Sequence, residues 1–125
     1  MVQVEANACG KPVVAIDAMA FRDTMVHGET ALLAGVAQEI KIQEAVLGEA
    51  QGFPPNHRVQ FPYERTSDYR ASVPDLATYL LRLMKGTSER ERMGAAGRQR
   101  AVEHYDYRLV ARSFARLMRE KLGIE

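Results

Sequence analysis

The sequence lacks residues and runs that several protein classes require. It has no tryptophan, and Cys9 is its only cysteine, so no internal disulfide can form. We interpret this as a cytoplasmic protein in a reducing compartment, with Cys9 buried as a small apolar side chain. No apolar run approaches the roughly 20 residues that cross a bilayer, and residues 1–3 do not begin a signal peptide. The net charge of +1 gives no general attraction to nucleic acid or to an anionic membrane.

Motifs for metals and cofactors are also missing. His27, His57 and His104 are far apart in sequence, and none has ligand spacing to another histidine or to cysteine. No G-x-G-x-x-G, Walker A or G-x-S-x-G motif is present. Gly94 and Gly97 lie within a helical pattern, so we interpret them as positions of close helix packing. We therefore expect no metal, no cofactor and no catalytic residue in this chain.

The most informative segment runs from Glu5 to Asp17. Gly10 suits the left-handed position just past a helix end, and Pro12 follows because it cannot continue the helix. Residues 13–16 form a continuous apolar run, which is typical of a parallel strand buried on both faces. Asp17 then stands where the carboxyl end of the strand would open to a ligand crevice. This order predicts an α/β protein.

The 125-residue chain is long enough for one hydrophobic core and predicts a single domain. A helical turn at residues 21–26 leads to a second apolar strand at 31–34, in agreement with a parallel β-α-β unit. Alternating apolar and polar side chains then predict a hairpin inserted within residues 38–71. We expect its strands near 38–47 and 57–62.

The remainder of the chain is polar at first and then helical. We expect the polar residues 61–71 to wrap the surface. Residues 72–122 have the pattern of three helices. Ser72 is expected to cap the first, an S-x-x-E capping box at residues 88–91 the second, and Asp106 the third.

Three blocks of sequence, of which the first spans residues 5–33, resemble one known family, the retaining glycosyltransferases with the GT-B fold, in their C-terminal nucleotide-sugar-binding domain. Residues 5–15 are similar to the family's EAMACGKPVVA, and residues 17–33 to its D-V-G-G-I-P-E-I-V-x-D-G-x-T-G-L-L. Residues 89–98 resemble the family's LRERMGxAGR, and residues 103–107 its E-x-F-x-W helix start. The resemblance implies a partial Rossmann-like lobe with a short parallel sheet, an inserted hairpin and three C-terminal helices.

The resemblance also implies a donor-binding site. Glu5 matches the second of two family glutamates and would accept hydrogen bonds from the two ribose hydroxyls of a nucleotide sugar, which suits the two oxygens of a carboxylate. The alternative for Glu5 is a solvated side chain near a helix end. The segment from Asp17 to Asp23 would line the donor crevice. The implied donor-site residues are Glu5, Asp17, Met19, Ala20, Arg22 and Asp23.

Within that segment the sequence differs from the family. Met19 and Ala20 replace a Gly-Gly pair, whose small size lets backbone N–H groups approach a sugar or phosphate. Arg22 and Asp23 replace Pro-Glu. Arg22 is expected to be either a phosphate contact or a surface arginine on a loop.

The function implied is part of an enzyme that transfers a sugar from a nucleotide-sugar donor, with retention and without a required metal, to an unknown acceptor. The family's first glutamate and the cations that hold the diphosphate would precede Met1. We therefore expect a truncated lobe whose isolated chain does not catalyse transfer. Its expected partners are the nucleotide sugar and either the missing N-terminal lobe or another copy of the chain. Membrane association is expected only through the parent enzyme.

A non-catalytic, dimerising module derived from the same fold is the alternative. Half of a parallel sheet exposes a strand edge and an apolar face, which edge pairing or helix exchange in a homo-oligomer would cover. Nucleic-acid binding would need one continuous positive face, whereas acidic residues are interspersed among the arginines of the last two helices. We therefore expect no nucleic-acid partner. The acidic residues are Glu89, Glu91, Glu103, Asp106 and Glu120.

Overall fold

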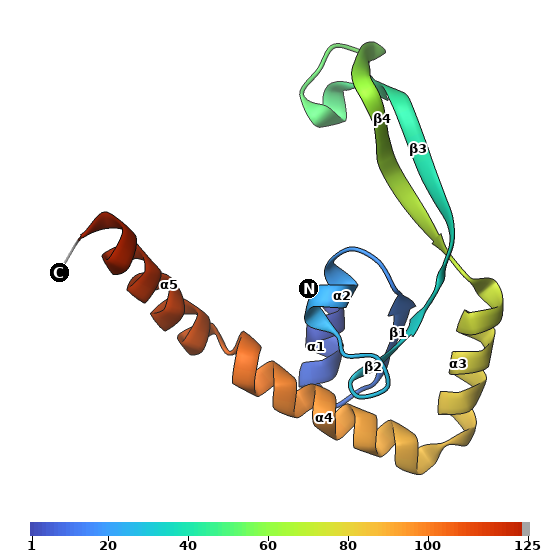
Figure 1. The fold of residues 1–125 in the computed structure, drawn as a ribbon, viewed down its shortest axis with the longest axis vertical. Coiled ribbons are helices and arrows are strands. Elements are labelled where there is room, and N and C mark those ends of the chain that lie inside the picture. The colour runs from blue at the N-terminus through green and yellow to red at the C-terminus, as the bar shows by residue number, and fades with distance from the viewer. Residues whose placement is uncertain (124–125) are drawn as a thin grey trace.

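A small α/β body carries two projections (Figure 1). The structure, a computed structural model, describes residues 1–123. The body contains a parallel two-stranded sheet, and the projections are a long antiparallel hairpin and a C-terminal helix. The mixed α/β fold expected from the sequence is confirmed, as are the short parallel sheet, the inserted hairpin and the three following helices.

The parallel sheet pairs β1 (Val13–Ile16) with β2 (Ala31–Ala34), in register from Val13 with Ala31 to Ile16 with Ala34. Both strands have the bounds that their apolar runs predict. β2 is buried along its whole length, but β1 is only half-buried. The prediction that β1 is buried on both faces is therefore wrong, because β2 is its one neighbour in the sheet and its other edge is open.

Helices cover the two faces of this sheet. On one face, α1 (Val2–Ala8) and the second half of α4 (Thr87–Tyr105) pack against Ala31 and Leu33. On the other face, α3 (Val73–Lys85) and the first half of α4 pack against Leu32. The core thus alternates along the strands, as side chains of a pleated sheet must. Its buried apolar members include Val4, Met25, Ala31, Leu32, Leu33, Leu83, Met93 and Ala101.

The hairpin consists of β3 (Val36–Leu47) and β4 (His57–Ala71), joined through the short 3-10 helix η1 (Glu49–Gln51). β4 is much longer than predicted, since it stays paired with β3 as far as Ala71. The predicted end of this strand near residue 62 is wrong, because residues 61–71, which were expected to wrap the surface, continue the strand. Three register shifts in the ladder break the simple alternation that marks a strand in sequence, yet they preserve pairing.

Two of the three predicted helix N-caps are confirmed. The Ser72 hydroxyl accepts from the Asp75 N–H at 3.3 Å, and Asp106 Oδ1 accepts from the Arg108 N–H at 2.8 Å. The predicted capping box at residues 88–91 is wrong. α4 begins at Thr87 directly after Gly86, so Ser88 already lies inside the first turn and cannot cap it.

The single cysteine also departs from expectation. Cys9 occupies the C-cap of α1, where its backbone N–H donates to the carbonyl of Glu5 at 3.0 Å. Its side chain is exposed, so the prediction of a buried Cys9 is wrong. Gly10, which follows with φ of +68°, ends the helix as predicted. No helix in the described part of the chain is both long and apolar enough to cross a membrane.

Candidate functional site

The loop after β1 and the short helix α2 (Ala20–Thr24) that follows it together hold most of the predicted site residues. Both strands of the parallel sheet end at this edge, and the Asp17 N–H continues the ladder by donating to the Ala34 carbonyl at 2.6 Å. Ala18 is buried and anchors the loop, and Met19 and Ala20 are exposed. The segment from Asp17 to Asp23 is therefore a short loop and the first residues of α2, anchored at the carboxyl end of β1.

Met19 has an unusual backbone conformation. Its φ of +52° and ψ of −143° lie in a region that glycine enters freely and L-residues rarely adopt. Its side chain is 70% exposed, so burial of the methionine does not explain the conformation. Strain of this kind costs about 1–3 kcal/mol and clusters at functional sites. The backbone at Met19 thus has the geometry of a glycine in the position where the resemblance implies one.

Arg22 and Asp17 form an ion pair across the loop. Arg22 Nε donates to Asp17 Oδ1 at 2.9 Å, and both side chains face solvent, with 61% and 42% exposed. A surface pair of this kind is worth less than about 1 kcal/mol and exchanges readily with other partners. Arg22 is therefore held over the loop by Asp17, in a position where an anionic ligand would compete with the carboxylate.

Asp23 contributes its backbone to the structure, and its side chain is exposed. The carbonyls of Asp23 and Thr24 at the end of α2 accept from the Arg100 guanidinium of α4, at 3.5 and 3.1 Å. A cation at a helix C-terminus satisfies carbonyls that have no partner within the helix. Sequence reasoning missed Arg100, because its partners are more than seventy residues away along the chain.

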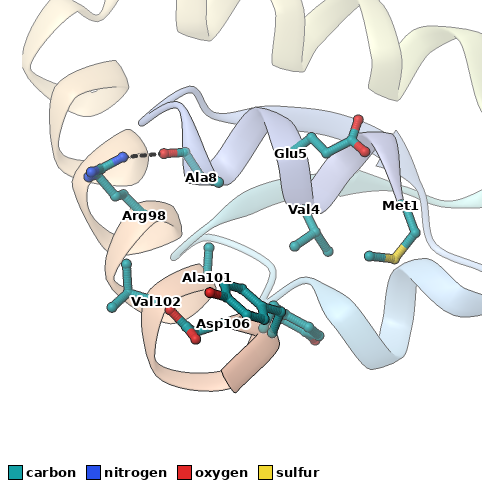
Figure 2. A pocket seen from close by; sticks show the side chains of 10 residues that line it. Met1, Val4, Glu5, Ala8, Arg98, Ala101, Val102 and Asp106 are labelled. Carbon is teal, nitrogen blue, oxygen red and sulfur yellow. Dashed lines mark hydrogen bonds between the residues drawn. The ribbon is translucent and has the colours of Figure 1, made fainter. Parts of the chain in front are cut away.

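Glu5 lies on α1, beside a different hollow. A pocket of about 360 Å³ lies between α1 and the junction of α4 with α5 (Tyr107–Leu122), and its lining side chains are drawn in Figure 2. Val4 and Ala101 line its apolar part, whereas the Glu5 carboxylate points away from Asp106 toward solvent. Glu5 is exposed, and its carboxylate has no hydrogen bond or ion pair to any other residue of the described chain.

The structure does not bring Glu5 and the loop together in one cavity. The pocket beside Glu5 includes no residue of the Asp17–Asp23 loop, and the groove along the open edge of β1 includes Phe21 of α2 but not Glu5. A link between the two places exists through Gln3, whose Nε2 donates to Thr24 Oγ1 at 3.3 Å. The two parts of the predicted site are therefore adjacent in the fold and separately exposed.

Asn7 is a buried polar residue that the sequence did not single out. It is 2% exposed, and its Nδ2 donates to the carbonyls of Lys11 and Thr30, at 3.0 and 3.2 Å. Its Oδ1 is buried without a hydrogen-bond partner among the described residues. Asn7 joins α1 to the turn before β1 and to the start of β2. It positions the helix that carries Glu5.

The clearest shift in pKa lies outside this region, between α3 and α4. Arg82 Nε donates to Glu89 Oε2 at 2.9 Å, which lowers the pKa of the Glu89 carboxyl below its ordinary value and raises that of Arg82. The pair ties two helices across the Gly86 turn and faces solvent, so its role is structural. Within residues 1–123, no three His, Cys, Asp or Glu side chains form a group that could hold a metal ion.

Comparison with protein-family models, with curated proteins and with solved structures finds no match to this chain.

Proposed function

We propose that this chain supplies part of the donor site of a retaining GT-B glycosyltransferase, as a portion of a Rossmann-like nucleotide-sugar-binding lobe. In this proposal the parent enzyme transfers a hexosyl group from a nucleotide sugar to an acceptor. The isolated chain binds part of the donor and does not catalyse transfer. Its partner in the complete enzyme is a preceding lobe that provides the diphosphate-binding cations.

The observation that carries the proposal is the backbone of Met19. The sequence resemblance implies glycine at this position, where a small residue lets the main chain approach a ligand. The chain has methionine there and yet keeps φ of +52°, at the carboxyl end of a parallel strand. Ligands of open α/β sheets bind at this end of the strands. The backbone keeps a conformation that suits glycine although methionine occupies the position, and retention of this strained conformation supports a role in ligand binding.

Two side chains fit the proposed roles. The exposed Glu5 carboxylate has both oxygens available for the vicinal hydroxyls of a ribose. Arg22 sits over the loop in a solvent-facing pair with Asp17, from which a phosphate could take it as a bidentate partner. Neither arrangement requires a metal ion.

Titration with nucleotide sugars tests this proposal. UDP-, GDP- and ADP-sugars are added to the chain, and binding is followed by calorimetry and by amide chemical shifts in NMR. We expect shifts concentrated at residues 17–23 and on α1. Because a hydrogen bond to a charged group is worth about 1.5–3 kcal/mol, Glu5→Ala should weaken binding by about 10- to 100-fold.

The control is Glu91→Ala, which removes another exposed carboxylate, on α4, that is not among the predicted site residues. It should leave the affinity unchanged. Absence of shifts with all three donors at millimolar concentration would contradict the proposal.

A dimerising interaction module is the second candidate, and the open edge of β1 favours it. Val2, Ala6, Pro12 and Phe21 border this edge and form an apolar groove of about 450 Å³ with the strand. An uncovered parallel strand is a template for pairing with another chain. Sedimentation velocity distinguishes this function: concentration-dependent dimers, reduced by Ile16→Lys in the groove, support it, and a monomer at high concentration excludes it.

A further inference from the structure

Helix α5 stands apart from the body of the protein. After Asp106 the chain turns away, and α5 extends from the end of α4 into solvent (Figure 1). None of its sixteen residues is buried. Most helical stability in proteins comes from packing of one face, so a helix of this length with no buried residue has a face available for a partner.

One side of α5 is apolar, and the side chains on it are between 39% and 72% exposed. Side chains at positions i, i+3, i+7, i+10 and i+11 from Tyr107 share this side, as the 3.6-residue period requires. Phe114 at its centre is 62% exposed, and Tyr107 is 72% exposed. The face is broad enough to mark a site of interaction. Its members are Tyr107, Val110, Phe114, Leu117 and Met118.

The opposite side of α5 is strongly cationic. The helix contains five basic residues and one acidic residue, Glu120, which gives it a net charge of +4. The whole chain has a net charge of +1, so the other residues together have a charge of −3. Although the net charge of the whole chain is close to zero, its positive charge is concentrated on α5. The basic residues on this side are Arg108, Arg112, Arg116 and Arg119, and the fifth, Lys121, lies at the end of the helix on the same side as Phe114.

We propose that α5 binds the surface of an anionic lipid bilayer, lying in the interface with its apolar face toward the acyl chains. A helix that combines a distinct apolar face with an arginine-rich polar face and low overall hydropathy has the composition of an interfacial helix. Its charge is complementary to anionic headgroups. The same charge opposes a second copy as the occupant, because pairing two α5 helices brings together two segments of +4.

The start of the helix fits this placement. The Arg108 guanidinium lies over the Tyr107 ring, 5.3 Å from its centroid, and its Nε donates to the Tyr107 hydroxyl at 3.0 Å. Tyrosine rings with an apolar body and a polar tip concentrate at the membrane–water boundary. The anionic remainder of the protein is repelled by the same surface, so contact is restricted to α5. This inference does not depend on the proposed donor site.

Vesicle flotation tests the proposal with the unmodified chain. We expect the protein to float with vesicles of phosphatidylcholine containing about 30 mol% phosphatidylglycerol and not with phosphatidylcholine alone. Raising the salt from about 0.05 to about 0.5 M should weaken binding, because screening shortens the reach of the charges. Replacing two cations, Arg112→Gln with Arg119→Gln, should lower the affinity on the order of 30-fold, at about fivefold for each charge near the surface.

A matched pair of variants tests whether binding depends on the apolar face of α5 in particular or on any exposed apolar side chain. Phe114→Glu on α5 should abolish flotation, whereas Leu81→Glu on α3, an apolar residue that is 52% exposed against 62% for Phe114, should leave it unchanged. Circular dichroism of each variant verifies that the fold is retained. Failure of the unmodified chain to float with anionic vesicles overturns the proposal, as does equal loss in both variants. A salt-stable dimer that is broken by Phe114→Glu, without vesicle binding, identifies a second copy as the occupant instead.

Discussion

A Cβ atom on Gly94 would lie 2.1 Å from the carbonyl oxygen of Gly10. Helix α4 therefore crosses the turn after α1 at a distance that only glycine permits. Three residues further on, a Cβ on Gly97 would lie 2.6 Å from Asn7 Nδ2. The interpretation of Gly94 and Gly97 as positions of close packing is confirmed, and the contact is against backbone at Gly94 and against a buried amide at Gly97.

Gly94→Ala should be one of the most destabilising single substitutions in the chain. Backbone atoms cannot move aside as a flexible side chain can, so we expect a loss of about 3 kcal/mol in the free energy of unfolding. Urea denaturation measures it. Gly48→Ala is the control, since a Cβ there would meet only Gln51 Oε1 at 3.8 Å. A loss at Gly94 no larger than at Gly48 contradicts the packing described.

Asn7→Ala should cost about 2 kcal/mol of stability, because it leaves the carbonyls of Lys11 and Thr30 without their donor in a buried region. Gln43→Ala, at an exposed position in β3, provides a comparison and should change stability by less than about 0.5 kcal/mol. Both values follow from denaturant titration. Similar stabilities of the two variants would show that Asn7 does not join α1 to the sheet.

Met19→Gly should stabilise the fold. Glycine adopts a positive φ without the strain of about 1–3 kcal/mol that methionine carries there. Glycine also makes the unfolded chain more flexible, which offsets part of this benefit. We therefore expect the free energy of unfolding to rise by about 1 kcal/mol. Met19→Ala shortens the side chain without relieving the backbone, so it serves as the control and should give no gain. Thermal unfolding of the three proteins decides the matter: equal midpoints exclude strain at Met19.

Glu89 should make stability depend on pH in the acid range. Its pKa is lowered below the ordinary 4.5 in the folded state, chiefly by the hydrogen bond from Arg82. A carboxyl with a lowered pKa contributes its stability fully above the unfolded value and loses it as the pH falls through the folded value. Unfolding free energies between pH 6 and pH 3 should therefore decline less steeply in Glu89→Gln. Glu91→Gln, the control, should keep the slope of the unmodified protein.

The sequence predicted those parts of the fold that local patterns determine. β1 and β2 begin and end where their apolar runs do, and the caps at Ser72 and Asp106 involve partners two or three residues away. The extent of β4 was missed because its register shifts remove the alternation along the strand. Pro62 added to the difficulty, since proline is tolerated only where its missing N–H faces away from a partner strand.

The candidate site was less predictable. The loop at the end of β1 follows from the order of the elements, and the resemblance drew attention to Met19. The conformation of Met19 and the pairing of Arg22 with Asp17 depend on three-dimensional arrangement. Arg100 and Asn7 support the site through contacts between segments distant in sequence, and no local signal marks such contacts.

The base of the hairpin has a practical consequence for engineering. The Ser72 N–H donates to the Gly35 carbonyl at 2.8 Å, and the Gly35 N–H donates to Asp75 Oδ2 at 2.9 Å. The two ends of the hairpin therefore lie side by side where they join the body, so the hairpin is connected to the body at a single place. Replacing residues 36–71 with a short glycine-serine connector should give a smaller protein that keeps the fold of the body. The same junction should accept a foreign domain in place of the hairpin.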